Sequence, residues 1–100
     1  QIECYVPAPK RRYGYFALPL LYKDQFVGRI DCKAFRDQRR LALQRVHLEC
    51  AKADTEAVCT ALAAALPDFA TFQACDQVSV HEVWPRPAAK ILKTAVAKHF

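Results

Sequence analysis

Lysine and arginine are concentrated in the first half of this 100-residue chain, where aromatic residues are interleaved with them. Residues 1–50 hold ten Lys or Arg against five Asp or Glu, whereas residues 51–100 hold five against five. Cations of this kind bind phosphates and exposed aromatic rings stack on unpaired bases, so the pattern favours a surface for nucleic acid. The candidate DNA-binding residues are Lys10, Arg11, Arg12, Lys23, Arg29, Lys33, Arg36, Arg39 and Arg40.

A second interpretation of the same residues stays open. Basic turns commonly face only water, and aromatic residues in an apolar strand commonly belong to the core. Asp31 lies between Arg29 and Lys33 in an alternating segment, so the two cations stabilise its charged form. This makes Asp31 a poor general base and favours a surface ion pair.

The cysteines argue against a disulfide framework or a zinc site, because they are odd in number, widely spaced and without a Cys-x-x-Cys pair. We expect most of them to be buried thiols in a reducing, cytoplasmic setting. Glycine-rich phosphate loops, Gly-x-Ser-x-Gly and His-Glu-x-x-His are absent. The sequence therefore predicts no catalytic residue, no metal site and no cofactor, and no apolar run approaches a membrane span.

The elements that must position the basic residues follow from hydrophobic periodicity and from breaking residues. In chain order they are an extended entry at 1–12 and strands at 13–22, 26–35 and 41–49. A helix capped by Asp54 then runs to Leu66, where Pro67 stops it, and a strand at 77–84 and a helix at 88–100 follow. This order, β-β-β-α-β-α, predicts an α+β fold. We expect an antiparallel β-meander or small barrel-like sheet with one or two packed helices.

Alternation along three of these strands predicts which side chains face the core, and in the strand at 77–84 it puts Val78, Val80 and Trp84 in phase. In the strand at 26–35, alternate residues from Phe26 point inward, which places Arg29 and Lys33 on a shared outer face. In the strand at 41–49 the apolar phase slips, and a bulge near Gln44 and Arg45 would turn all four of its large apolar residues inward.

Three segments, ECYVPAPKRRYGYFALPLLY, FVGRIDCKAFR and LQRVHLE, resemble the C-terminal part of the winged-helix DNA glycosylases typified by AlkZ and YcaQ. The shared motifs are the tyrosine-rich strand Tyr13–Phe16, the Gly-Arg-x-Asp-x-Lys strand Gly28–Lys33 and the closing His47–Glu49. The resemblance implies a monofunctional glycosylase that hydrolyses N-glycosidic bonds of alkylated purines, in a family with members that unhook interstrand crosslinks. It also implies tandem winged helices followed by a small β-rich domain.

The length of 100 residues predicts a single domain, and the resemblance implies that it is a C-terminal fragment of a larger winged-helix protein. The family's catalytic Gln-x-Gln or Gln-x-Asp motif is absent here, so we expect no catalysis by this chain alone. The expected partners are damaged double-stranded DNA and the winged-helix domains of the same protein, with no membrane and with dimerisation through exposed apolar surface. The expected location is the bacterial cytoplasm, at the nucleoid when acting on DNA.

Two other hypotheses compete with a DNA-contacting role. In the first, the domain is purely structural: it packs against the last winged helix and does not contact DNA. In the other it is a small enzyme that uses Asp31 or a cysteine.

Overall fold

The computed structural model describes residues 2–4 and 15–100, of which the side chains of 2–4 and 16 are not described. The elements are β1 (Ile2–Cys4), β2 (Tyr15–Tyr22), β3 (Gln25–Phe35), β4 (Arg40–Leu48), a 3-10 turn (Lys52–Asp54), α1 (Thr55–Phe72), β5 (Gln77–Trp84) and α2 (Pro87–Ala97). The predicted α+β class and the order β-β-β-α-β-α are confirmed, with the short β1 added at the edge.

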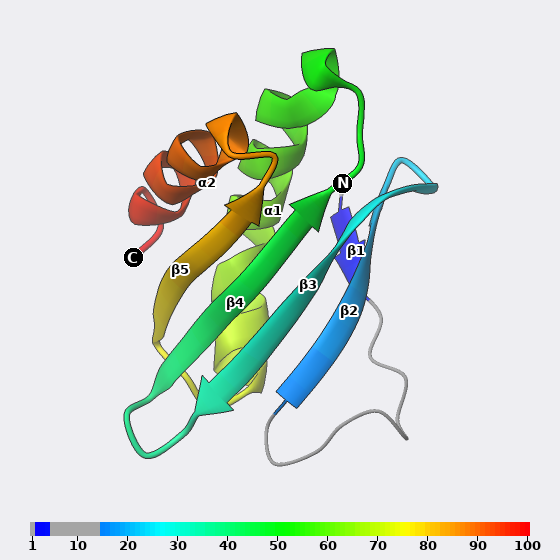
Figure 1. The fold of residues 1–100 in the computed structure, drawn as a ribbon. Coiled ribbons are helices and arrows are strands. Elements are labelled where there is room, and N and C mark those ends of the chain that lie inside the picture. The colour runs from blue at the N-terminus through cyan, green and yellow to red at the C-terminus, as the bar shows by residue number, and fades with distance from the viewer. Residues whose placement is uncertain (1, 5–14) are drawn as a thin grey trace.

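The strands form one open sheet in the order β1-β2-β3-β4-β5 (Figure 1). Neighbours from β1 to β4 are antiparallel, as expected, but β5 pairs parallel with β4, so the sheet is mixed. The long helix α1 makes this possible, because a parallel neighbour needs a crossover that carries the chain back along the sheet, whereas an antiparallel one needs only a turn. The sheet does not close into a barrel.

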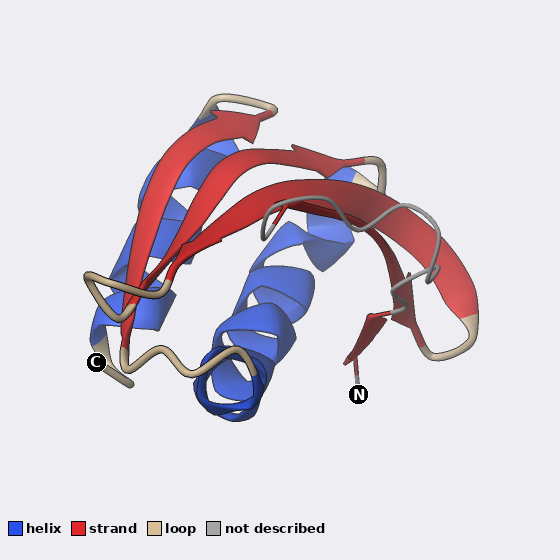
Figure 2. Cartoon of the chain, turned by 90° about the horizontal axis from the view of Figure 1, so that it is seen from below, coloured by secondary structure: helices blue, strands red, loops and turns tan. Residues whose placement is uncertain are grey.

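Both helices lie on the same face of the curved sheet (Figure 2). The core is the layer between them, where Leu18, Ile30 and Leu43 from the sheet meet Leu62 of α1 and Leu92 of α2, all 2% exposed or less. The opposite face of the sheet carries no helix. We call it the outer face.

Bulges in β3 and β4 decide which side chains reach the outer face. Asp31 pairs with Arg45 but Cys32 pairs with Leu43, so Gln44 is the extra residue. The bulge predicted at this position is confirmed, and Leu41, Leu43, Val46 and Leu48 are all buried. A second register shift at Val27 buries that residue and leaves Phe26 51% exposed, opposite to the predicted alternation.

Helix α1 continues through Pro67 to Phe72, so the prediction that proline ends it was wrong. Proline removes one backbone hydrogen bond. The apolar stripe of α1 nevertheless runs past it, and Ala70 is buried one turn later. Burial of this last part of the helix against the sheet outweighs the lost bond. Asp54 does precede the helix, as predicted, but its side chain makes no capping hydrogen bond.

The second helix begins at Pro87, which occupies the first turn, where a missing N–H costs no helical hydrogen bond. It ends at Ala97, three residues before the predicted end. Neither of the described helices is long and apolar enough to span a membrane.

Candidate nucleic-acid interface

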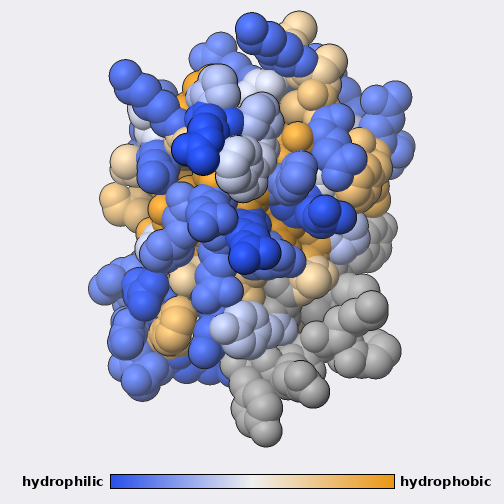
Figure 3. Space-filling model, in the orientation of Figure 1, coloured by the Kyte–Doolittle hydropathy of each residue, from blue (hydrophilic) through white to orange (hydrophobic). Residues whose placement is uncertain are grey.

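Four cations of β3 and β4 lie on the outer face, each next to a residue buried on the inner one. Arg29 precedes buried Ile30, Lys33 follows buried Cys32, and the burial alternates in the same way beside Arg40 and Arg45. We call Arg29, Lys33, Arg40 and Arg45 the outer-face cations. Figure 3 looks onto this face, and hydrophilic side chains are prominent over β3, β4 and β5.

Lys33 and Arg40 form a cluster with two aromatic rings. The Lys33 ammonium lies 4.8 Å from the ring centres of both Tyr15 and Phe35, and the Arg40 guanidinium lies 4.5 Å from that of Phe35. Cation–π contacts at exposed sites contribute about 0.5–1 kcal/mol each. They hold the cations in place without neutralising them, so the full charge remains available to an anion.

Arg40 is also positioned by neutral hydrogen-bond acceptors. Its Nε donates to Gln38 Oε1 at 3.2 Å, and its Nη1 donates to Ser79 Oγ at 2.9 Å. Ser79 in turn contacts His81 Nε2 at 3.1 Å. The guanidinium is therefore oriented by β5 and by the preceding turn while it keeps its charge.

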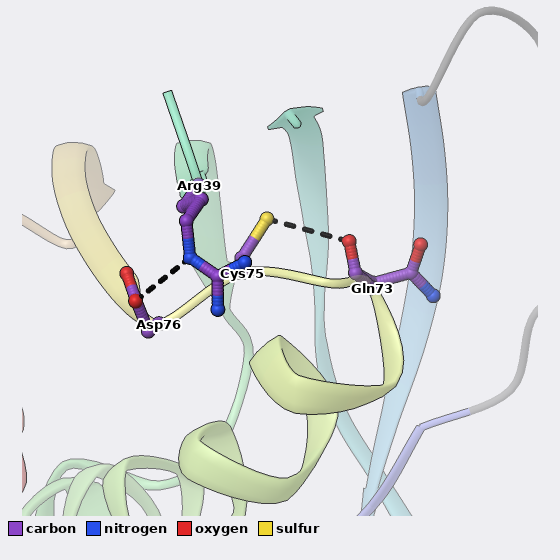
Figure 4. Close-up of polar contacts among 4 residues, drawn as sticks. All are labelled: Arg39, Gln73, Cys75 and Asp76. Carbon is purple, nitrogen blue, oxygen red and sulfur yellow. Dashed lines mark hydrogen bonds and ion pairs between the residues drawn. The ribbon is translucent and has the colours of Figure 1, made fainter. Parts of the chain in front are cut away.

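Arg36 and Arg39, in the turn between β3 and β4, instead make contacts within the protein. Arg36 donates from Nε to the backbone carbonyl of Gln73 at 3.3 Å and from Nη2 to Gln73 Oε1 at 3.0 Å. Arg39 Nε pairs with Asp76 Oδ2 at 2.9 Å, and this hydrogen bond raises the pKa of the guanidinium (Figure 4). Both side chains fasten the turn to the loop between α1 and β5, and DNA contact by either stays a prediction.

The backbone reinforces this junction. The amides of Asp76 and Gln77 both donate to the carbonyl of Arg39, at 3.0 and 3.1 Å. Cys75 Sγ lies 3.5 Å from the Gln73 carbonyl oxygen, and burial raises the pKa of this thiol (Figure 4). These contacts hold the turn against the start of β5, where the β4–β5 pairing begins with Arg40 opposite Gln77.

Lys23 lies at the tip of the β2–β3 hairpin, at the opposite end of β3 from Lys33. Lys23 and Asp24 have φ angles of 52° and 65°, as in the two-residue turns that match the twist of a hairpin. The predicted turn is confirmed, and Lys23 Nζ lies 5.5 Å from the Tyr22 ring centre. The basic tripeptide Lys10, Arg11 and Arg12 lies outside the described residues.

A hollow of about 240 Å³ opens on the outer face across β3, β4 and β5. Its lining residues are Arg29, Asp31, Arg45, His47, Glu82 and Trp84. Sequence reasoning missed four of them as site residues: Arg45, His47, Glu82 and Trp84. Arg45 lies in the predicted bulge and His47 follows it, which was the available signal, whereas Trp84 was predicted to be in phase with Val78 and Val80. Val83 takes the inner position instead, and Trp84 is 39% exposed.

No catalytic group emerges among the described residues. Two ion pairs form there, Arg39–Asp76 and Arg45–Glu82, so the ion pair expected for Asp31 with its strand neighbours is absent. Burial raises the pKa of Cys59 to about 11, which leaves its thiol protonated and unreactive near neutral pH. No group of three or more potential metal ligands occurs in the part of the chain that the structure describes.

A comparison with protein families gives one match, to the family described as DNA glycosylase AlkZ-like, over residues 1–72. The matched residues run from β1 to the end of α1 and leave β5 and α2 outside. No solved structure matches the chain.

Proposed function

The chain belongs to the AlkZ-like DNA glycosylase family, and we propose that it is a DNA-contacting domain of a repair protein that acts on alkylated or crosslinked purines. In this proposal it is the C-terminal domain of a larger winged-helix protein. The chemistry on the base belongs to the winged-helix part, and this chain holds the duplex. The protein acts in the cytoplasm, at the nucleoid.

The observation that carries the proposal is the set of outer-face cations on a sheet face that no helix covers. Among the described residues, only Arg45 of these four has an acidic partner, Glu82, at 3.8 Å and with both side chains well exposed. Such an exposed pair contributes little, about 0–1 kcal/mol, and a phosphate can replace it. The other three cations are oriented by rings, neutral groups or strand position, and their charge is open to the DNA backbone.

Salt dependence of duplex binding tests the proposal quantitatively. If each outer-face cation neutralises one phosphate, log K falls with log salt with a slope of about −0.9 per contact, or about −3.6 for four. Affinity for a short duplex then drops roughly 150-fold between 50 and 200 mM salt. Replacing all four cations with glutamine is expected to remove most of this slope.

The matched control replaces four exposed lysines elsewhere, Lys52, Lys90, Lys93 and Lys98, with glutamine. Lys90 and Lys93 lie in α2, Lys98 follows it, and Lys52 lies in the 3-10 turn before α1. This variant therefore loses the same net charge as the outer-face variant but leaves the outer-face cations in place. Equal weakening by both variants would show a general charge effect and refute the assignment. Retained binding by the outer-face variant would do the same.

The purely structural alternative is favoured by exposed apolar side chains. Phe26, Phe72 and Phe100 are 51%, 80% and 45% exposed, which suits burial against other domains of the protein or a second copy. In that case both glutamine variants leave duplex affinity unchanged, while replacing Phe72 with serine changes the oligomeric state of the chain or weakens its docking to the winged helices.

A further inference from the structure

The only tryptophan of the chain stands at the end of β5, opposite His47 in the parallel register. Its indole lines the hollow of about 240 Å³ on the outer face, together with Arg29 and Arg45. Buried tryptophans usually bring a large gain in core packing, so a ring that is 39% exposed beside arginines is a candidate for ligand contact.

The charges around this hollow balance. Arg29 and Arg45 supply two positive charges, and Asp31 and Glu82 supply two negative ones. The two carboxylates also give this hollow hydrogen-bond acceptors, which a site for phosphate alone would not need. The hollow offers both donors and acceptors beside a flat aromatic ring, and a nucleobase has the matching edge and face.

The polar groups of the hollow have hydrogen-bonding capacity to give to a ligand. Arg45 Nε and Glu82 Oε1 are 3.8 Å apart, which is longer than a hydrogen bond. Both side chains are also well exposed, at 71% and 63%. A ligand that accepts from Arg45 and donates to Glu82 therefore displaces only a weak contact.

A cation–π contact with Arg86, outside the hollow, fixes the position of the Trp84 ring. The Arg86 guanidinium lies 4.7 Å from the indole ring centre. Arg86 lines a second hollow that also includes Trp84 and Glu82, but it does not line the one with Arg29 and Arg45. This cation–π contact orients the ring, and the first hollow stays open to a ligand.

We propose that the hollow formed by Arg29, Asp31, Arg45, His47, Glu82 and Trp84 binds one unpaired nucleobase of a DNA strand, stacked on Trp84. The outer-face cations Lys33 and Arg40 then lie along the strand's phosphates, so the inference rests on the proposed function. Glu82, Trp84 and Arg86 lie beyond residues 1–72, the part of the chain that matches the family.

Fluorescence of the single tryptophan reports stacking directly. The chain is titrated with a short duplex that has one unpaired thymine at its centre and with the same duplex fully paired. We expect quenching and about fivefold or greater tighter binding for the duplex with the unpaired base, since removing a stacking aromatic costs at least that much. Because the Trp84 variants lack this signal, their binding is followed by the fluorescence anisotropy of a labelled duplex. Trp84→Phe keeps the preference, and Trp84→Ala abolishes it while affinity for the paired duplex stays unchanged.

The control is Tyr15→Ala, which removes another exposed aromatic ring, 42% exposed and not among the residues that line the hollow. It is expected to leave the preference intact, and unchanged thermal unfolding of each variant shows that it is folded. Equal affinity and equal quenching with both duplexes overturn base holding but leave duplex binding standing. Absence of binding to either duplex at low salt overturns both the inference and the proposed function.

Discussion

Replacing Gly28 with alanine probes the contact between β3 and β4 at the centre of the sheet. Gly28 has a φ of 152°, a conformation that side-chain-bearing residues rarely adopt. A Cβ there would overlap the backbone carbonyl oxygen of His47 and lie 3.0 Å from Cα of Leu48. Next to it, the Glu49 amide donates to the Val27 carbonyl at 2.7 Å, so the two backbones have little room to separate.

The expected cost has two parts. Holding alanine in a glycine conformation costs about 2 kcal/mol, and forcing two central strands apart costs about 2 kcal/mol more, as for overpacking of a core. The sum of about 4 kcal/mol is a large share of the 5–15 kcal/mol that stabilises a typical domain. With roughly 4–8 °C per kcal/mol for a domain of this size, Gly28→Ala should lower Tm by about 15–30 °C.

The assay is thermal and urea unfolding followed by circular dichroism and by Trp84 fluorescence. Arg29→Ala is the control, because it places alanine at the next, exposed position of the same strand and should change Tm little. A Gly28→Ala variant that unfolds within a few degrees of the wild type would refute the reasoning, since it would mean that the sheet accepts a Cβ at this point.

Three further predictions concern α1, the β3–β4 turn and a buried thiol. Pro67→Ala should raise Tm by restoring a helical hydrogen bond in α1, worth up to about 3 kcal/mol. An unchanged Tm would contradict this gain, and a lower Tm would show that the proline stabilises the helix. Arg36→Ala should cost about 1–2 kcal/mol in urea unfolding by leaving buried Gln73 without its donor, whereas Lys90→Ala should cost little. Because burial raises the pKa of Cys59 from 9.0 to about 11, the unfolded chain loses this proton first, and the free energy of unfolding should fall as pH rises from about 9 towards 11. Cys59→Ala should flatten this decline, and an identical pH slope in the variant would contradict the assignment.

Local patterns in the sequence were enough to predict the strands that carry the outer-face cations. Alternation in β3 placed Arg29 and Lys33 on the solvent side, and both lie there. The phase slip in β4 predicted a bulge, which the structure has at Gln44. These features depend on side-chain period and turn geometry within a few residues, so they can be recognised without knowledge of the rest of the fold.

Tertiary packing decided the features that depend on residues distant in sequence. Pro67 is a helix breaker by its local chemistry, yet burial of the last turn of α1 carries the helix through it. Arg36 and Arg39 looked like free basic residues, but their partners stand 37 residues away along the chain. No local pattern reports such a partner, because the contact forms only once β5 lies beside β4.

The position of Trp84 has the same origin. Its spacing from Val78 and Val80 indicated a core residue, but the pairing of β5 with β4 places Val83 inward and the indole outward. The amino-acid sequence therefore determined the class of fold, the family motifs and the charge of the first half of the chain. Only the assembled sheet determined which of these charges lie beside an exposed aromatic ring, because side chains from three strands meet there solely through the register of their backbone hydrogen bonds.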